Sequence, residues 1–130
     1  MSKTYVVTSA IIKNGDKFFI AKRADTKHFA PGKWEFISGF IEEAEPAEQT
    51  ILRELQEEIN ATGKIEKSLP PYFFYDDGEN WLVIPFVVSV EDINIKTDPA
   101  EHSKGKWVTF EEIGQIPDLA DQAESLKKML

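Results

Sequence analysis

An acidic segment dominates this sequence. Seven glutamates fall between Glu42 and Glu58, opposed by a single base, Arg53, so this segment carries six of the eight net negative charges of the 130-residue chain. Pro46, a residue tolerated at the start of a helix, is followed by thirteen residues without glycine or proline, and Asn60 then suits a left-handed C-terminal cap. We therefore expect a helix over residues 47–59 that has to accommodate this charge.

Helical spacing places the glutamates beside an apolar stripe. At about 100° per residue, Glu54, Glu57 and Glu58 share an arc of roughly 100°. The apolar residues of the predicted helix fill the adjoining arc: Ile51, Leu52, Leu55 and Ile59. Because such a stripe faces the protein core, the carboxylates are expected at the border of the core and not on the solvent side.

The acidic edge is either a solvated helix face or a cation site. Solvated faces usually place Lys or Arg four residues after each Glu, because such pairs stabilise a helix. Here Glu54 is followed by Glu57 and Glu58 at the two contact spacings, and Glu57 is followed by Ala61. A divalent cation would turn this repulsion into attraction, so the pattern favours a cation site.

Composition excludes several other classes of protein. With no cysteine, the chain has no disulfide, thiolate metal site or cysteine nucleophile. A hydrophobic content of 42% and a length of 130 residues indicate one globular domain, expected over residues 1–130. The acidic balance argues against a nucleic-acid polymer as partner. Without a signal-peptide pattern or a long apolar run, we expect a cytoplasmic protein that does not bind membranes.

The remaining segments predict a mixed sheet with helices packed on its faces. Apolar runs at residues 4–13 and 17–23 flank Asn14-Gly15-Asp16, a hairpin signal. Further strands are expected at Trp34–Ile37, Tyr72–Tyr75, Trp81–Val90 and Gly105–Phe110, with a loop at 28–33 and a turn at 76–80. A closing amphipathic helix is expected at Asp121–Leu130, with Ala123, Leu126 and Leu130 on one face.

The spacing of residues 39–61 resembles the signature box of the Nudix hydrolases. The chain reads Gly39, five residues, Glu45, seven residues, and then Arg53-Glu54-Leu55-Gln56-Glu57-Glu58-Ile59-Asn60-Ala61. The segments Gly32–Phe36 and Glu101–Val108 extend the similarity to MutT-like members over nearly the whole chain. Three positions depart from the signature: Asn60 replaces its last glycine, Ala61 its last aliphatic residue, and Ile37-Ser38 the usual Pro-Gly. The resemblance implies the Nudix fold, a mixed β-sheet sandwiched between α-helices (α/β/α).

The resemblance also implies a chemistry. It is the Mg²⁺-dependent hydrolysis of a phosphoanhydride bond in a nucleoside diphosphate linked to another group, with Mn²⁺ as a substitute ion. Among the activities of the family, we favour that of a compact MutT-like (d)NTP pyrophosphohydrolase. ADP-ribose, a nucleotide sugar or a dinucleoside polyphosphate stay open as substrates, as does a non-catalytic nucleotide-binding module. The partner is then a small-molecule nucleotide, and the chain is either a monomer or a homodimer.

Roles for individual residues follow from the same resemblance. The metal ligands would be the Gly39 carbonyl with Glu54, Glu57 and Glu58. Glu45 and Arg53 would fasten the box loop to the helix, which is also what a purely structural salt bridge would do. Catalytic roles would fall to Glu54, Glu57, Arg53 and Glu101. The general base is either a box glutamate or Glu101, for which a solvated loop carboxylate is the alternative.

Substrate-binding candidates are fewer and rest on residue type. Phe29, Trp34, Phe74 and Trp81 could stack on a nucleobase, although strand aromatics often belong to the core. Arg23, one of two arginines in the chain, could meet phosphate. Asp121 falls where some members of the family place a base-reading polar residue, with a helix N-cap as its alternative.

Overall fold

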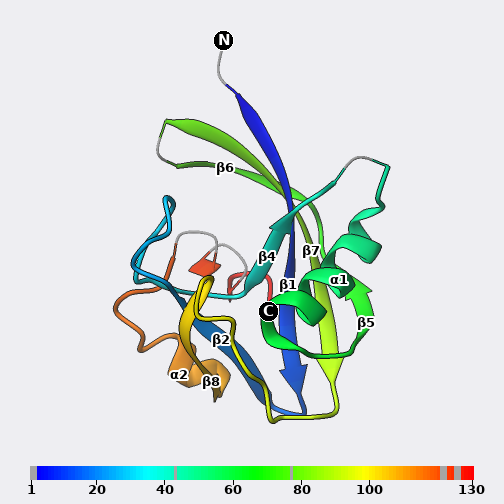
Figure 1. Cartoon of the computed structure of the whole chain (residues 1–130), viewed down its shortest axis with the longest axis vertical. Coiled ribbons are helices and arrows are strands. Elements are labelled where there is room, and N and C mark those ends of the chain that lie inside the picture. Colours follow the sequence, from blue (N-terminus) through cyan, green and yellow to red (C-terminus); the bar gives the residue numbers. More distant parts are fainter. Residues whose placement is uncertain (1–2, 43, 77, 121–122, 125–126) are drawn as a thin grey trace.

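Two long parallel strands form the centre of the sheet. The computed structural model describes residues 3–42, 44–76, 78–120, 123–124 and 127–130. In it, β1 (Thr4–Asn14) runs beside β7 (Glu79–Val90), from the Thr4–Asn80 pair to the Lys13–Ser89 pair (Figure 1). These two strands are the frame on which the rest of the described chain is arranged.

The other strand pairings of the described chain are antiparallel. β1 pairs with β2 and β4, β2 pairs with β3 and β8, and β7 pairs with β5 and β6. The bounds of these strands are Lys17–Arg23 for β2, Trp34–Glu35 for β3, Ile37–Phe40 for β4, Gly63–Ser68 for β5, Tyr72–Asp76 for β6 and His102–Val108 for β8. The predicted hairpin is confirmed, since Asn14 pairs with Lys17 across Gly15 and Asp16.

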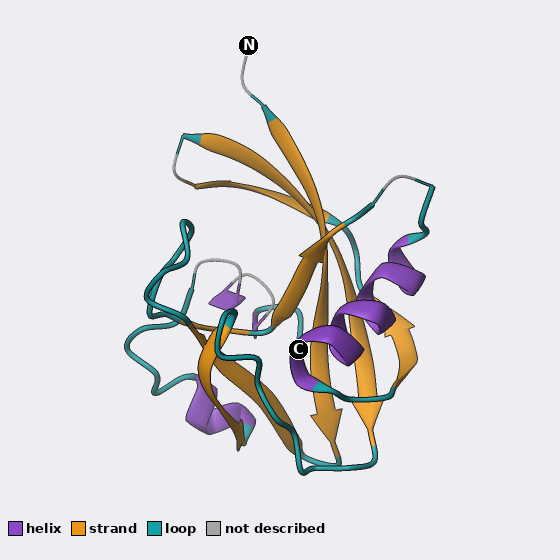
Figure 2. Cartoon of the chain, viewed as in Figure 1, coloured by secondary structure: helices purple, strands orange, loops and turns teal. Residues whose placement is uncertain are grey.

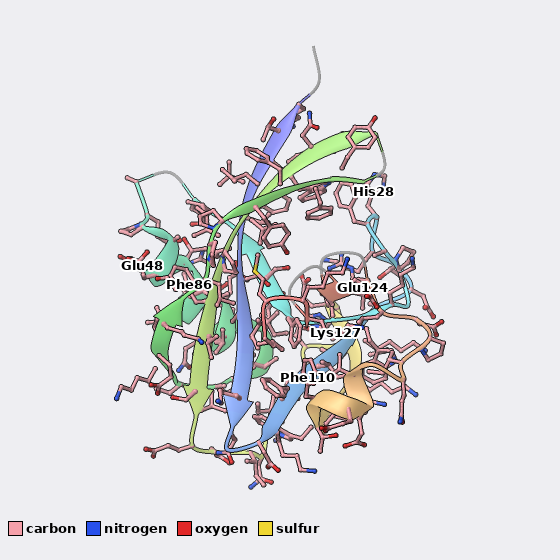
Figure 3. All side chains as sticks on the ribbon, turned by 180° about the vertical axis from the view of Figure 1, so that it is seen from behind. His28, Glu48, Phe86, Phe110, Glu124 and Lys127 are labelled. Atoms are coloured by element: carbon pink, nitrogen blue, oxygen red, sulfur yellow. The ribbon has the colours of Figure 1, made fainter. Side chains whose placement is uncertain are left out.

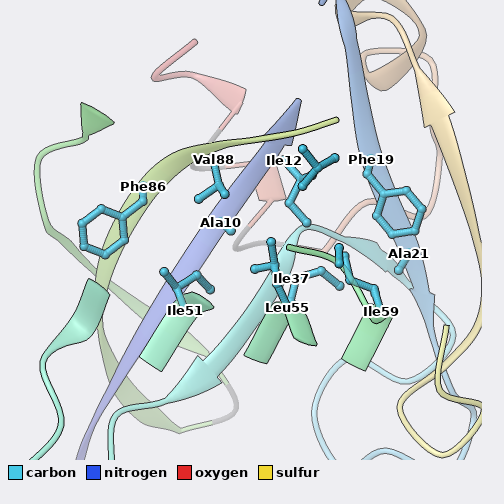
Figure 4. Close-up of a cluster of buried hydrophobic side chains, with 12 residues drawn as sticks. Ala10, Ile12, Phe19, Ala21, Ile37, Ile51, Leu55, Ile59, Phe86 and Val88 are labelled. Atoms are coloured by element: carbon cyan, nitrogen blue, oxygen red, sulfur yellow. The ribbon is translucent and has the colours of Figure 1, made fainter. Parts of the chain in front are cut away.

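The central strands are apolar on both sides because both faces of the sheet are covered. Ala10 and Ile12 of β1 belong to the core under α1 (Ala47–Ile59), which lies across one face of the strands (Figure 2). Figure 4 shows Ile51 and Leu55 of this helix facing the strand side chains. The intervening Ile11 instead joins a second core on the opposite face.

The second core is closed by the C-terminal part of the chain. Ile113 of α2 (Phe110–Ile113), Leu119 and Ala123 pack there with Phe36 and Ile11. With helical residues packed on both faces of a mixed sheet, the expected α/β/α arrangement is confirmed. Among the described helices, none is long and apolar enough to cross a membrane.

The strands predicted at Tyr72–Tyr75 and Trp81–Val90 are slightly longer in the structure, so the turn between them is shorter than the predicted 76–80. Two other predicted strands differ more. The strand predicted at Trp34–Ile37 is two strands, since β3 ends at Glu35 and β4 begins at Ile37. They pair with different partners, β2 and β1, and Phe36 between them is fully buried in the second core.

The strand predicted to run to Phe110 ends instead at Val108, after starting at His102. Thr109 then caps α2. The Thr109 hydroxyl accepts a hydrogen bond from the Glu112 backbone amide, and the Glu112 carboxylate accepts one from the Thr109 backbone amide. This reciprocal capping ends the strand before Phe110.

One strand was not predicted, and one helix lies partly outside the described residues. β5 is largely polar, yet it pairs with the end of β7, with Gly63 opposite Val90. Of the predicted closing helix, Asp121 and Leu126 lie outside the described residues. Ala123 is fully buried, as expected for its apolar face, whereas Leu130 is exposed.

The acidic helix has the bounds that its sequence predicts. Pro46 precedes its first turn with φ −64° and ψ 151°, and Asn60 ends it in the left-handed conformation with φ 53° and ψ 41°. The Asn60 amide donates to the carbonyl of Gln56, and the Ala61 amide donates to that of Leu55. The Asn60 cap therefore fixes where the helix stops and where β5 begins.

Replacing Asn60 tests this cap. We expect N60V to lower the free energy of unfolding by about 1–2 kcal/mol, because a β-branched residue is strained at positive φ. N60G should stay within about 0.5 kcal/mol of the wild type, since glycine adopts this conformation freely. Urea unfolding followed by circular dichroism measures both variants, and equal stability of N60V and N60G would contradict the cap.

Candidate active site

A cleft of about 340 Å³ opens where α1, β4 and the loops after β2 and before β8 meet the far ends of β6 and β7. Its volume lies within the range of small-molecule sites, roughly 300–1,000 Å³. One wall is acidic, and its residues are Glu35, Glu42, Glu54, Glu58 and Glu101. The other wall is aromatic, and its residues are Phe29, Phe40, Phe74 and Trp81. The cleft is therefore divided into a charged part and an apolar part.

The glutamates of α1 are buried in the order that the helical wheel predicts. Glu57, farthest from the apolar stripe, has a side chain that is 57% exposed. Glu54, nearer the stripe, is 16% exposed, and Glu58, at its edge, is only 9% exposed. Glu54 and Glu58 line the cleft, whereas Glu57 does not. Helix register alone thus directs two of the three carboxylates into the site.

Glu58 is the most perturbed carboxylate of the cleft. Burial, followed by the charges of Glu54, Glu101 and Glu35, raises the pKa of Glu58 to about 9, and Lys27 opposes this rise. Its Oε2 atom is buried without a hydrogen-bond partner in the described structure. A carboxylate held this way favours a proton or a cation at its free oxygen.

The side chain of Glu54 packs on the backbone of Gly39. A Cβ atom at Gly39 would lie 2.5 Å from Glu54 Cδ, so a larger residue at this position of β4 would displace the Glu54 side chain. Gly39 pairs with Thr8 of β1, which holds the strand against the helix. Burial, more than any neighbouring charge, raises the pKa of Glu54. Gly39, the first residue of the signature, thus provides the surface on which the Glu54 side chain packs.

Arg53 donates hydrogen bonds to three of the described glutamates, of which Glu45 and Glu57 lie outside the cleft and Glu54 lines it. Its Nε donates to Glu45 Oε2 at 3.0 Å and its Nη2 to Glu45 Oε1 at 2.9 Å. Its Nη1 reaches Glu57 Oε2 at 3.0 Å and Glu54 Oε1 at 3.3 Å. The hydrogen bonds from Arg53 and then Thr50 lower the pKa of Glu45. The predicted Glu45–Arg53 pair is present, and it fastens the loop before α1 to the helix.

Glu101 enters the cleft from the loop that precedes β8. Its carboxylate pairs with Lys27, with 2.6 Å between Oε2 and Nζ. Its backbone carbonyl accepts from the Ala24 amide at 2.9 Å, and the Asp98 amide of the same loop donates to the Glu58 carbonyl at 2.9 Å. Two loops distant in sequence are therefore tied to each other and to the end of α1.

A buried polar network next to the cleft was not predicted from the sequence. Glu35, 4% exposed, accepts from Arg23 Nη1 at 2.9 Å, and the same oxygen lies 2.9 Å from His102 Nε2. Arg23 also donates from Nε to the Phe29 carbonyl at 2.7 Å. Arg23 lines the cleft, and its hydrogen bonds to Glu35 and the Phe29 carbonyl fix the shape of the loop. The sequence signal for this network was Glu35 itself, an acid between the aromatic residues Trp34 and Phe36. A carboxylate buried in such a segment requires hydrogen-bond partners.

The aromatic candidates belong to two different clusters of side chains. Phe74 stacks on Trp81 at 6.0 Å with 10° between the rings, and Phe29 meets Trp81 edge-on at 4.8 Å. These three line the cleft. Trp34 does not: it packs against the second core, and the ammonium of Lys106 lies 4.5 Å from its ring centre. Asp121 lies outside the described residues.

The oxygen donors of the acidic wall suit a hard divalent cation. Mg²⁺ prefers carboxylate, carbonyl and water oxygens, and Glu58 offers a buried oxygen with no partner in the described structure. Within the described ranges no three acidic or imidazole side chains are gathered into a preformed metal site. Glu57 in particular is held by Arg53 outside the cleft. The residues fit the ion by chemistry, and Glu57 would have to leave Arg53 to join them.

Comparison with known proteins agrees with the resemblance of residues 39–61 to the Nudix signature. The NUDIX domain family matches residues 3–130. An RNA pyrophosphohydrolase of Rickettsia bellii is 30% identical over 123 residues, which is 82% of this chain and 74% of that protein. An 8-oxo-dGTP diphosphatase of Escherichia coli is 40% identical over 62 residues, 48% of this chain and 47% of that protein.

Solved structures share the fold. A MutT protein from Methanosarcina mazei superposes with a TM-score of 0.88 at 20% identity, covering 98% of this chain and 92% of that one. The NUDIX domain of Shewanella oneidensis NrtR, solved with ADP ribose, gives a TM-score of 0.82 at 21% identity, covering 99% and 87%. At these identities the likeness concerns the fold alone.

The burial of Glu58 predicts a pH-dependent stability in the metal-free protein. Its pKa is raised on folding from 4.5 to about 9, so the folded state binds more protons than the unfolded state between these values. Stability is therefore lost as the pH rises through this window. In EDTA we expect E58Q to melt higher than the wild type at pH 8, by on the order of 5 °C, and at nearly the same temperature at pH 5. A difference that did not change between pH 5 and pH 8 would contradict the buried, ionisable Glu58.

Proposed function

Because this chain belongs to the NUDIX domain family, we propose that it is a metal-dependent MutT-like pyrophosphohydrolase of nucleoside triphosphates, built as one domain over residues 1–130. The relatives' names, RNA pyrophosphohydrolase and 8-oxo-dGTP diphosphatase, both describe cleavage of a phosphoanhydride bond, and this chain is a hydrolase of that type. The observation that carries the proposal is the buried oxygen of Glu58, which has no partner in the described structure and lies in a cleft whose other wall is aromatic.

The division of the cleft matches the two parts of a nucleotide. The aromatic wall, formed by Phe29, Phe40, Phe74 and Trp81, suits a flat apolar base. The acidic wall suits the polyphosphate only through cations, because carboxylates alone would repel it. A nucleotide in the cleft would therefore place its base on the first wall and its phosphates along the second.

The proposed metal ligands are the Gly39 carbonyl and the carboxylates of Glu54, Glu57 and Glu58, with Mg²⁺ as the ion and Mn²⁺ as a substitute. Such an ion neutralises phosphate oxygens and makes a bound water nucleophilic. The chain's own part is to hold the oxygens in place. Gly39 allows close approach to Glu54, and the Glu45–Arg53 pair fixes the loop against α1.

The general base is proposed from the carboxylates that line the cleft. Of the four residues with predicted catalytic roles, Glu54 and Glu101 line the cleft, whereas Glu57 and Arg53 do not. Burial raises the pKa of Glu54, and a shift in this direction suits a carboxylate that accepts a proton near neutral pH. Glu54 is therefore our first choice as base. Glu101, paired with Lys27 in the described structure, is the second.

The 5′-triphosphate end of an RNA is the second candidate substrate. The match to an RNA pyrophosphohydrolase covers 82% of this chain, more than the 48% covered by the 8-oxo-dGTP diphosphatase match. Against a polymer stands the net charge of −8, since RNA binding relies on basic surface. We therefore place free nucleotides first.

A substrate panel tests the proposal. With Mg²⁺, the protein should release pyrophosphate from a (d)NTP faster than it cleaves ADP-ribose, a nucleotide sugar, a dinucleoside polyphosphate or 5′-triphosphorylated RNA. E58Q and E57Q should each lower this rate by roughly 10²-fold or more, the scale of a positioned catalytic group. E48Q is the matched control: Glu48 lies on the first turn of the same helix, exposed at the outer edge of the molecule (Figure 3).

The outcomes of the panel separate the alternatives. Undiminished turnover in both E57Q and E58Q would contradict the ligand assignment. Nucleotide binding without turnover of any substrate would favour the non-catalytic module.

The aromatic wall predicts a separate effect on affinity. F29A should raise the KM for a nucleotide by about tenfold or more with little change in kcat, because base–aromatic stacking contributes about 1–3 kcal/mol. Inhibition by inorganic pyrophosphate, which has no base, should stay unchanged. Phe29 is only partly buried, and thermal melting checks that F29A folds. An equal loss of pyrophosphate inhibition would place Phe29 away from the base.

A further inference from the structure

The flexible side chain of Lys27 places a positive charge against the acidic wall of the cleft. Lys27 Nζ lies 2.6 Å from Glu101 Oε2, with the Lys27 side chain 27% exposed and that of Glu101 34% exposed. Arg23, the other basic residue lining the cleft in the described structure, is held by Glu35 and the Phe29 carbonyl. A lysine ammonium is a point charge on a flexible stem, so Lys27 can exchange partners where Arg23 cannot.

The charge of Lys27 extends beyond its direct partner. Lys27 lines the same cleft as Glu58 and Glu54, and the loop of its partner Glu101 is tied to α1 by the hydrogen bond from the Asp98 amide to the Glu58 carbonyl. Arg23, the other cation among the described residues of the cleft, is bonded to Glu35. Lys27 therefore partly neutralises the same acidic wall that a divalent ion would neutralise.

The loop that carries Lys27 spans the two walls of the cleft. Phe29, two residues on, belongs to the aromatic wall, while the Lys27 side chain reaches the acidic wall. Arg23 fixes this loop through Nε to the Phe29 carbonyl, and the Gly32 amide donates to the Arg23 carbonyl. Figure 3 shows the loop, marked by His28, close to the end of the β6–β7 hairpin. The ammonium thus lies at the acidic wall, where the phosphates are proposed to bind.

We propose that Lys27 is a built-in counter-cation: it neutralises Glu101 in the metal-free protein, is displaced by a divalent ion, and then binds the phosphates of the nucleotide. This inference rests on the proposed function, because it needs both the ion and the nucleotide in the cleft. It adds a residue outside the signature box to the site, and it couples the two ligands. The ion frees Lys27, and the phosphates replace the partner that Lys27 has lost.

Binding of Mn²⁺ alone gives the first test. In calorimetry on metal-free protein, K27M should bind Mn²⁺ about two- to fivefold more tightly than K22M, the range expected for a partly exposed ion pair. K22M is the matched control, since Lys22 lies on the adjacent β2 but does not line the cleft. K27R, which keeps the charge, should bind Mn²⁺ as the wild type does.

Binding of a nucleotide gives the second test. With saturating Mn²⁺, K27M should bind α,β-methylene-dGTP about tenfold more weakly than K22M, because a charge-assisted contact to phosphate is lost. Equal Mn²⁺ affinity of K27M and K22M, or equal nucleotide affinity, would overturn the role of Lys27 and leave the proposed function standing. Failure of wild-type protein to bind Mn²⁺ would overturn the metal-dependent function and the Lys27 role together.

Discussion

Repulsion between carboxylates at the edge of the core is the constraint on which this site depends. Glu58 is buried beside Glu54, and one of its oxygens has no partner in the described structure. Such an arrangement costs free energy of folding unless a proton or a cation takes the charge. The apolar stripe of α1 supplies the compensating stability, because Ile51 and Leu55 are fully buried against the sheet. The packing of the helix therefore maintains the charge cluster that binding of a cation would relieve.

The chain treats its acidic residues in two different ways. Outside the cleft, Arg53 satisfies Glu45 and Glu57 with direct hydrogen bonds, which fixes the loop before the helix. Inside the cleft, Glu101 pairs with the flexible Lys27, and one oxygen of Glu58 has no partner among the described contacts. The bidentate pairing of Glu45 with Arg53 stabilises the scaffold, whereas the incomplete pairing of Glu58 leaves an oxygen available.

Local patterns predicted the parts of the fold that local interactions determine. Pro46 and Asn60 marked the ends of α1, and the helical wheel ordered the burial of its glutamates, because both depend only on the chain's own geometry. Pairing between distant segments was not predictable in this way. β5 follows from its pairing with β7, and the Glu35–His102 contact joins residues 67 positions apart. The contact of Lys27 with Glu101 has the same origin, since two loops meet only after the sheet has formed.

The negative charge of the chain is compatible with a phosphate-bearing ligand if cations lie between them. A net charge of −8 would repel a free polyphosphate, but most of this charge belongs to one helix and the loop before it. Divalent ions held there would bring the region close to neutrality and attract phosphate oxygens. The rest of the chain carries a net charge of only −2, so it has no basic excess that would attract a long polyanion. The concentration of charge in one segment thus fits the short, metal-bridged ligand of the proposed function better than a polymer, and the aromatic wall beside it suits a flat apolar group on that ligand.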